Sequence, residues 1–188
     1  LAPGPDELVV VVPAALVAEA RDIVTGLPEG LSCTVSVVAG GAERTDSVAA
    51  GLAALTPAVE LVLVHDAARC LAPVGVFERV LAALAAGAAG AIPGVPVVDT
   101  IKVVDAGGFI TATPLRDSLR AVQTPQGFDR AALTAAHASG VAATDDAALV
   151  EALGHPVVVV DGDPLALKIT TAEDLTRVER LLAERAAP

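Results

Sequence analysis

The chain has 188 residues, a length that suits one domain with a substantial buried core. Hydrophobic residues make up 54% of it and aromatic residues only 2%, so disorder is excluded and the core must be built from alanine, valine, leucine and isoleucine. The 23 acidic residues outnumber the 12 lysines and arginines, and the net charge of −11 argues against broad binding to nucleic-acid phosphates. Any anionic ligand must therefore be held by a local group of basic side chains.

The two cysteines, Cys33 and Cys70, fit neither a disulfide framework nor a zinc site with paired ligands. They predict free thiols in a reducing compartment. No apolar run approaches the roughly 18 residues of a membrane span, and the acidic first residues do not resemble a secretory signal. We therefore expect a cytoplasmic protein that binds neither membranes nor nucleic acid.

Hydrophobic patterns predict an alternation of strands and helices along the chain. Short runs rich in β-branched residues predict strands at 8–12, 33–38, 59–64, 89–93 and 157–160. Helical periodicity between and after these runs predicts helices at 15–23, 45–55, 74–84, 129–136, 145–153 and 171–184. Near-continuous apolar strands that alternate with helices are typical of an α/β protein with a mostly parallel sheet sandwiched by helices.

One segment interrupts this alternation. Residues 97–104 and 109–113 read as two strands around the turn Asp105-Ala106-Gly107-Gly108. An isolated two-stranded ribbon is marginally stable in water, so we expect it to pack against a second subunit. The segment 97–117 is thus predicted to be a protruding β-hairpin arm for dimerisation, within a single domain that spans 1–188.

Polar chemistry is concentrated in His65-Asp66-Ala67-Ala68-Arg69, directly after the third predicted strand. Ligands of open parallel sheets bind beyond the carboxyl ends of the strands. A carboxylate at that place can hold a divalent cation, and an arginine can clamp a phosphate. From these residues alone, an internal ion pair between Asp66 and Arg69 is an equally good interpretation.

Four further stretches can each be interpreted either as ordinary structural elements or as parts of a binding site. Gly40 to Ser47 offers amide donors before a helix, or is an ordinary connecting loop. Gln123 to Phe128 has the proline and glycine of a turn, and Thr144 to Ala147 has the cap and acids of a helix start. Lys168 is either a surface side chain or a phosphate ligand.

Six motifs in a fixed order carry more weight together than any one of them alone. They are Gly40-Gly41-Ala42-Glu43-Arg44-Thr45-Asp46-Ser47, His65-Asp66-Ala67-Ala68-Arg69, Asp99-Thr100-Ile101-Lys102, Thr124-Pro125-Gln126, Thr144-Asp145-Asp146-Ala147 and Lys168-Ile169-Thr170. Together they closely resemble the 2-C-methyl-D-erythritol 4-phosphate cytidylyltransferase family over nearly the whole chain. The resemblance implies a Rossmann-like nucleotidyltransferase fold and transfer of a cytidylyl group from CTP to methylerythritol phosphate, with release of pyrophosphate, in isoprenoid synthesis.

The resemblance also implies roles for individual residues. The residues expected to bind the nucleotide are Gly41, Ala42, Ser47 and Ala67. Those expected to bind the acceptor are Arg69, Thr100, Thr124 and Thr144, and the expected catalytic residues are Asp66, Lys168 and Arg116. Asp66 would also hold Mg²⁺ or another divalent cation. The family's arm crosses to a partner subunit, so Thr100 and Arg116 would reach into the neighbour's site of a homodimer.

One family motif has no match in these residues, the glycine-rich loop Pro-Ala-Ala-Gly-x-Gly-x-Arg followed by Pro-Lys. We expect that a chain without it would turn over CTP very weakly and would leave a central strand position unpaired. Two alternatives remain open: a cytidylyltransferase for another polyol phosphate such as ribitol 5-phosphate, and a non-catalytic nucleotide-binding module. Whether a second catalytic domain follows is also open.

Overall fold

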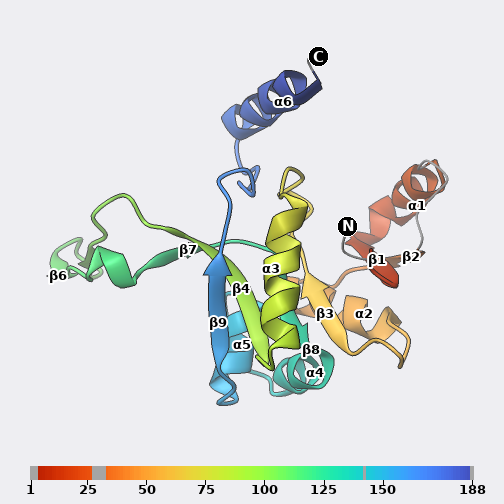
Figure 1. Cartoon of the computed structure of the whole chain (residues 1–188), viewed down its shortest axis with the longest axis horizontal. Helices are drawn as coiled ribbons and strands as arrows, with labels where there is room; N and C mark the ends of the chain where they lie inside the picture. The colour runs from red at the N-terminus through yellow and green to blue at the C-terminus, as the bar shows by residue number, and fades with distance from the viewer. Residues whose placement is uncertain (1–3, 27–32, 142, 187–188) are drawn as a thin grey trace.

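The computed structural model describes residues 4–26, 33–141 and 143–186, which form two sheets, an arm and flanking helices (Figure 1). Strands β1 (Glu7–Val12) and β2 (Thr34–Ala39) pair in parallel. Helices α1 (Val17–Thr25), which follows the 3-10 turn η1 (Ala14–Leu16), and α2 (Arg44–Ala54) pack on this pair. Within the described ranges no ladder joins it to the larger sheet.

The larger sheet has five strands built around β4. Its members are β3 (Leu61–Val64), β4 (Gly90–Pro96), β7 (Arg120–Val122), β8 (Gln126–Asp129) and β9 (Val157–Asp161). β7 and β8 run antiparallel to β4, and the Gln123 N–H between them donates to the Pro93 carbonyl at 2.8 Å. β9 is parallel to β4, and β3 lies antiparallel beside β8.

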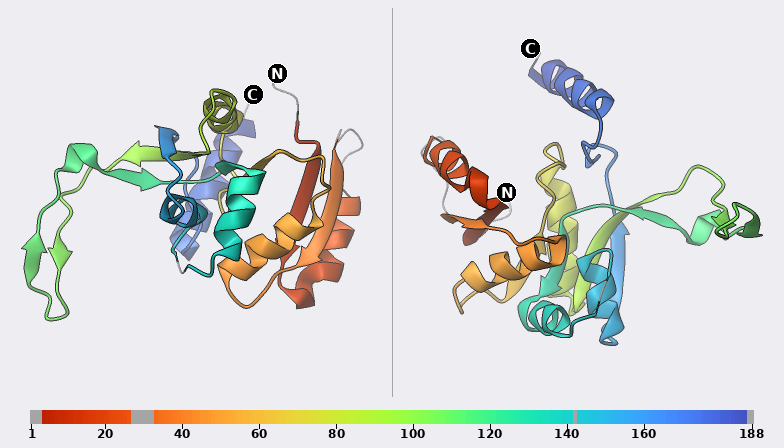
Figure 2. Two further views of the ribbon diagram at one scale, coloured as in Figure 1. Left: turned by 90° about the horizontal axis from the view of Figure 1, so that it is seen from below. Right: turned by 180° about the vertical axis from the view of Figure 1, so that it is seen from behind.

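Helices cover both faces of the five-stranded sheet, with α3 (Val74–Ala85) on one face and α4 (Arg130–Ala138) and α5 (Asp146–Ala152) on the other (Figure 2). Adjacent residues of one strand serve opposite sides because side chains alternate along a strand. Ile92 packs in the cluster that contains Leu133 of α4, whereas its neighbour Ala91 packs with Val80 of α3. This two-sided burial explains the near-continuous apolar runs in the sequence.

The α/β class is confirmed, and so are the strands and helices predicted outside the arm, with ends that differ by a few residues. In the arm, the strand predicted at 97–104 is limited to Val103–Val104. The expected mostly parallel sheet requires correction, because the larger sheet is mixed and β7 and β8 were not predicted. β8 reads Gln-Gly-Phe-Asp, which lacks the β-branched run by which the other strands were recognised. The interpretation of Gln126 to Phe128 as a turn is therefore wrong.

The expected hairpin is confirmed as a protruding arm between β4 and β7 (Figure 1). It contains β5 (Val103–Val104), β6 (Ile110–Ala112) and the 3-10 turn η2 (Arg116–Ser118). In its turn the carboxylate of Asp105 accepts the backbone N–H groups of Gly107 and Phe109, both at 2.9 Å. Gly108 has a φ of 82°, a left-handed conformation that favours glycine. At its two ends the arm continues into β4 and β7 of the larger sheet.

The last helix, α6 (Ala172–Ala186), begins with a capping box. The Thr171 N–H donates to the Asp174 carboxylate at 2.9 Å, and the Asp174 N–H donates to the Thr171 hydroxyl at 3.2 Å. Hydrogen bonds from Thr170 and Thr171 lower the pKa of Asp174 to about 2. No helix in the described ranges is both long and apolar enough to span a bilayer.

Gly127 of β8 supplies a test of how closely α3 packs on the sheet. A Cβ at this position would lie 2.4 Å from Val80 Cγ1 and 2.9 Å from Leu84 Cδ1. We expect Gly127→Ala to lower the free energy of unfolding by about 1–3 kcal/mol through overpacking, measured by urea denaturation. Gly75→Ala is the control, because a Cβ there meets only the end of the Arg79 side chain at 3.4 Å. Equal effects of the two substitutions would contradict this packing.

Candidate active site

The expected acid, Asp66, lies two residues beyond the end of β3. The β3–β8 register pairs Val64 with Gln126, so continuing it by two positions places Asp66 opposite Thr124. The Asp66 N–H accordingly donates to the Thr124 hydroxyl oxygen at 3.0 Å. Two motifs that are 58 residues apart in the sequence thus meet at one edge of the sheet.

Two cations converge on the Asp66 carboxylate. Lys168 Nζ lies 3.2 Å from Oδ2, and Arg69 Nε lies 3.3 Å from the same oxygen. Arg69 also donates from Nη1 to the Ala166 carbonyl at 2.7 Å, so its guanidinium is held between two chain segments. The structure therefore brings together four of the expected residues, and we call Asp66, Arg69, Thr124 and Lys168 the Asp66 cluster.

The segment after β9 carries Lys168 to this cluster and is held on both sides. The Ile169 N–H donates to the Ala68 carbonyl at 2.9 Å, which ties the segment to the turn that contains Asp66. The capping box at Thr171 and Asp174 then fixes the entry into α6 three residues after Lys168. These local contacts place the lysine ammonium within reach of the carboxylate.

The charges of the Asp66 cluster are unequal. Partial burial acts to raise the pKa of Asp66, but the charges and hydrogen bonds of Lys168 and Arg69 outweigh it and hold the pKa below its ordinary value of 3.8. The carboxylate is therefore ionised at neutral pH, and two cations around one anion leave an excess positive charge. In a chain of net charge −11, this is the kind of local basic group that an anionic ligand requires.

His65 belongs to the structural support of this turn. Its Nδ1 lies 3.0 Å from the Thr124 hydroxyl, and its ring centroid lies 5.1 Å from that of Phe77. Desolvation lowers the pKa of His65, against the opposing hydrogen bond to the Arg69 backbone and the charge of Asp66. The imidazole is therefore neutral at pH 7.

The expected nucleotide-binding residues lie at the start of α2, and we call residues 40–43 the nucleotide loop. Gly41 and Ala42 are exposed. The Gly41 N–H donates to the Ser47 hydroxyl at 3.2 Å, and that hydroxyl donates to the Glu43 carbonyl at 3.1 Å. Ser47 thus organises the loop from the first turn of the helix. Ala67, the fourth expected nucleotide residue, is exposed in the Asp66 turn.

The expected acceptor residue Thr144 is exposed and lies two residues before α5. Its neighbour Asp145 caps this helix by accepting the Ala148 N–H at 2.9 Å, as the sequence predicted. The other carboxylate oxygen of Asp145 accepts Gln126 Nε2 at 2.9 Å. Thr144 is therefore anchored next to β8, the strand that follows Thr124.

Thr100 and Arg116 are not brought to the Asp66 cluster of their own chain. Both are exposed and fall within residues 97–117, the segment that protrudes as the arm in Figure 1. Arg116 Nη1 donates to the Val98 carbonyl at 2.9 Å, a contact inside the arm. Their expected role in a neighbour's site stays a prediction.

Sequence reasoning missed a second polar cluster around Asp146. This residue was interpreted only as an acid in the first turn of a helix, but its side chain is 0% exposed and contacts Arg44 and His137. The sequence does not indicate which of two adjacent acids at a helix start is buried. In the structure Asp145 caps the helix and Asp146 is buried. The distinction depends on which face of α5 packs on α4.

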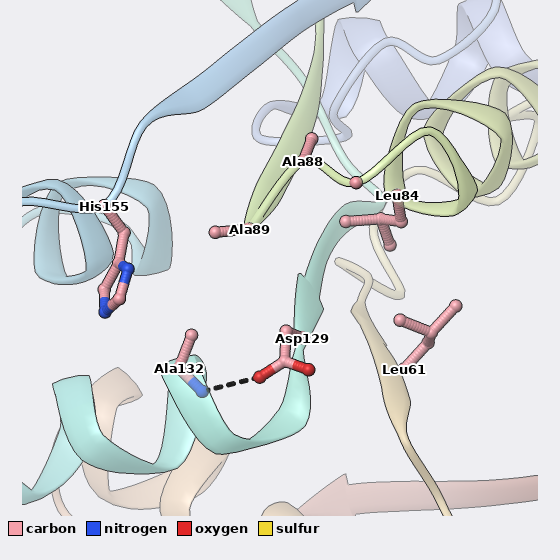
Figure 3. Close-up of a pocket in the computed structure, with 8 residues that line it drawn as sticks. Leu61, Leu84, Ala88, Ala89, Asp129, Ala132 and His155 are labelled. Carbon is pink, nitrogen blue, oxygen red and sulfur yellow. Dashed lines mark hydrogen bonds between the residues drawn. The ribbon is translucent and has the colours of Figure 1, made fainter.

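A cavity of about 340 Å³ lies away from the Asp66 cluster and is lined by residues such as Leu61, Asp129 and His155 (Figure 3). Leu61 begins β3, whereas Asp66 follows the end of that strand, so the cavity is at the opposite edge of the sheet. Asp129 is already used there, since its carboxylate accepts the Ala132 N–H at 2.9 Å. None of the expected site residues lines this cavity.

The candidate site can hold a divalent cation only together with a ligand. In the described ranges, no group of three or more His, Cys, Asp or Glu side chains could form a protein cage for a metal ion. Both basic groups contact Oδ2 of Asp66, and no described residue donates to Oδ1. Mg²⁺ is commonly bound by one or two carboxylates together with substrate phosphates. The donor set therefore fits a cation shared with a phosphate.

Comparison with known proteins agrees with this geometry. The model of the 2-C-methyl-D-erythritol 4-phosphate cytidylyltransferase family matches residues 3–184. The chain belongs to this family. The relative of that name from Nocardia farcinica is 56% identical over 182 residues, which cover 97% of this chain and 76% of the relative. The relative from Rhodococcus opacus is 50% identical over 183 residues, with coverage of 96% and 77%.

Solved structures of cytidylyltransferases share the fold. A 4-diphosphocytidyl-2C-methyl-D-erythritol synthase from Anaerococcus prevotii aligns with a TM-score of 0.86 at 32% identity, over 95% of this chain and 82% of that one. The cytidylyltransferase from Thermus thermophilus aligns with a TM-score of 0.75 at 39% identity, over 94% and 82%. The Rossmann-like nucleotidyltransferase fold expected from the motifs is thereby confirmed.

The lowered pKa of Asp66 predicts a particular acid sensitivity. A carboxylate whose folded pKa is depressed stabilises the protein above its unfolded pKa, and this stabilisation is lost as the pH falls through the folded pKa. We expect the difference in free energy of unfolding between wild type and Asp66→Asn, measured in urea from pH 7 to pH 3, to shrink below about pH 4. Lys168→Met should reduce the same pH dependence, because it removes a cation that lowers the pKa. Parallel wild-type and Asp66→Asn curves would refute the assignment.

Proposed function

We propose that this chain transfers the cytidylyl group of CTP to 2-C-methyl-D-erythritol 4-phosphate, forming 4-diphosphocytidyl-2-C-methyl-D-erythritol and pyrophosphate. Its family and its named relatives support this assignment. The observation that carries it is the meeting of Lys168, Arg69 and Thr124 at Asp66, because residues expected for catalysis and for acceptor binding then lie together at one positively charged end of the sheet.

The reaction forms a bond between an acceptor phosphate oxygen and the α-phosphorus of CTP, while the bond to the β-phosphate oxygen breaks and pyrophosphate leaves. The acceptor phosphate is already an anion, so no strong general base is required. Such transfer depends on positioning and on neutralisation of charge. Lys168, with 46% of its side chain exposed, can turn from Asp66 toward a phosphate, whereas Arg69 is held by the Ala166 carbonyl. His65, neutral and bonded to Thr124, supports the turn.

We include Mg²⁺ or another divalent cation as the cofactor, held at Asp66 together with the nucleotide phosphates. Among the described residues none donates to Oδ1 of Asp66, which supports this placement. When bound there, the cation would neutralise part of the triphosphate charge. Lys168 and Arg69 supply the remaining positive charge from the protein side.

Homodimerisation through the arm is part of the same proposal. The arm exposes large apolar side chains, with Leu115 81% and Phe109 75% exposed. Several large apolar side chains exposed on one short segment support an interaction site there. A second copy as the occupant accounts for Arg116, which the arm carries away from its own Asp66 cluster. We also place the enzyme in the cytoplasm, where CTP is available and free thiols such as Cys33 and Cys70 persist.

Replacement of Lys168 tests the proposed chemistry. In the full-length protein we expect Lys168→Ala to lower kcat for pyrophosphate release from CTP and methylerythritol phosphate by roughly 100-fold or more, because charge stabilisation of the transferring phosphate is lost. Arg180→Ala, which removes an exposed cation on α6, is the control and should leave kcat unchanged. Wild type that transfers cytidylyl groups to ribitol 5-phosphate in preference to methylerythritol phosphate would overturn the acceptor assignment.

Mixing two inactive variants tests whether Arg116 acts in the neighbour's site. Arg116→Ala and Lys168→Ala should each be inactive alone, but a mixed dimer regains one complete site when the arm supplies Arg116 across the interface. Pyrophosphate release should therefore recover on mixing. Leu115→Ser should shift the protein from dimer to monomer in sedimentation experiments. Mixtures that stay inactive, with exchange of subunits verified, would exclude the shared site.

A further inference from the structure

A buried carboxylate outside the Asp66 cluster joins three helices. Asp146, the first residue of α5, accepts Arg44 Nη2 of α2 at 2.7 Å on Oδ2. Its Oδ1 lies 2.9 Å from His137 Nε2 of α4. A buried carboxylate is costly unless it is paired and hydrogen-bonded. These two contacts therefore restrict where the first turn of α2 can lie relative to α5.

His137 determines how the Asp146 carboxylate is oriented. Its side chain is buried, and its Nδ1 has no hydrogen-bond partner among the described residues. Nε2 is the ring nitrogen that faces the carboxylate, so a proton on Nε2 fits the site. His137 then donates to Oδ1 of Asp146, and this leaves Oδ2 directed at Arg44.

Arg44 is the first residue of α2, and the nucleotide loop is bound to that same turn. Ser47 holds Gly41 by its hydroxyl, and the Glu43 N–H donates to the Asp46 carboxylate at 3.2 Å. A Cβ on Gly41 would lie 2.2 Å from Asp46 Cβ, so the loop backbone lies directly against the helix. Any displacement of the α2 start therefore displaces the loop.

The residues on either side of Asp146 connect α5 to the strand beside the expected acceptor residue Thr124. Asp145 accepts Gln126 Nε2 at 2.9 Å, and Gln126 Oε1 accepts the Ala147 N–H at 3.3 Å. Gln126 begins β8, two residues after Thr124 of the Asp66 cluster. The start of α5 is thus fixed to the strand that also supports the acceptor residues.

We propose that the Arg44–Asp146 pair, oriented by His137, positions the nucleotide loop against the Asp66 cluster and so sets the affinity for CTP without touching it. The inference rests on the proposed function, since it assigns these residues to the cytidine nucleotide. Arg44 and Asp146 are positioning residues. Arg44, with 40% of its side chain exposed, is free to turn to solvent once its partner is lost.

Asp146→Asn removes the pair with little change in shape. The Asn carbonyl oxygen still accepts from His137, but its NH₂ then faces the Arg44 guanidinium, and two donors cannot bond. We expect the Kd for CTP, measured by calorimetry with Mg²⁺ on the full-length protein, to rise roughly tenfold, and KM for CTP to rise more than kcat falls. Arg44→Lys should act similarly, since an ammonium lacks the planar guanidinium that fits this carboxylate. The double variant should be no worse than either single one.

Hydrogen exchange without ligand separates positioning from a general loss of stability. The amides of Gly41 to Arg44 should exchange faster in Asp146→Asn, whereas those of the β4 core should not; Arg180→Met, a surface arginine on α6, is the matched control. Unchanged CTP affinity in folded Asp146→Asn and Arg44→Lys would overturn the inference. Wild type that binds CTP without turnover would refute the proposed function alone, because the affinity comparison still decides the positioning role. Wild type that binds no CTP would refute both.

Discussion

The placement of β8, antiparallel between β3 and β4, is the constraint on which the site depends. Every second residue from Thr124 to Phe128, in β8 and just before it, has a different role. Phe128 fills the core and is fully buried, Gln126 holds the start of α5, and Thr124 receives the Asp66 N–H. Because side chains alternate between the two faces along a strand, a slip of one residue would turn all three to the opposite face. The core that stabilises the sheet is therefore also what aligns the site.

Electrostatics explains why Asp66 is useful beside two cations. Lys168 and Arg69 would repel each other and remain poorly ordered without an anion between them. The carboxylate keeps them close and in place before a phosphate arrives, which reduces the reorganisation that binding requires. Arg69 has a second, fixed partner in the Ala166 carbonyl, whereas the exposed Lys168 has Asp66. Arg69 is therefore held more firmly than Lys168. Under the proposed function, Arg69 would bind a phosphate in a fixed position, whereas Lys168 could move with the phosphate during transfer.

Most of the fold could be predicted from the sequence, because strands such as 8–12 and helices such as 74–84 have strong local patterns. β8 could not, since Gln-Gly-Phe-Asp carries no strand signal and its pairing depends on residues far away in the chain. The approach of Lys168 to Asp66 likewise came from the family resemblance, because no local rule brings together residues about a hundred positions apart. Asp146 was missed for a related reason: helix-start acids are ordinarily solvated, and only the packing of α5 on α4 buries this one.

The nucleotide loop and the Asp66 cluster are attached to different sheets. The position of α2 therefore determines the distance between them. The nucleotide loop belongs to the β1–β2 side, whereas the Asp66 cluster belongs to the five-stranded sheet. At its start α2 is held by Asp146, and at its end Arg130 of α4 donates to the carbonyls of Leu55 and Val59 at 3.2 Å and 3.3 Å. Leu52, between these anchors, packs in the core beside Leu133. A helix held at both ends and along its length cannot tilt freely, so these side chains set the distance from the nucleotide loop to the Asp66 cluster.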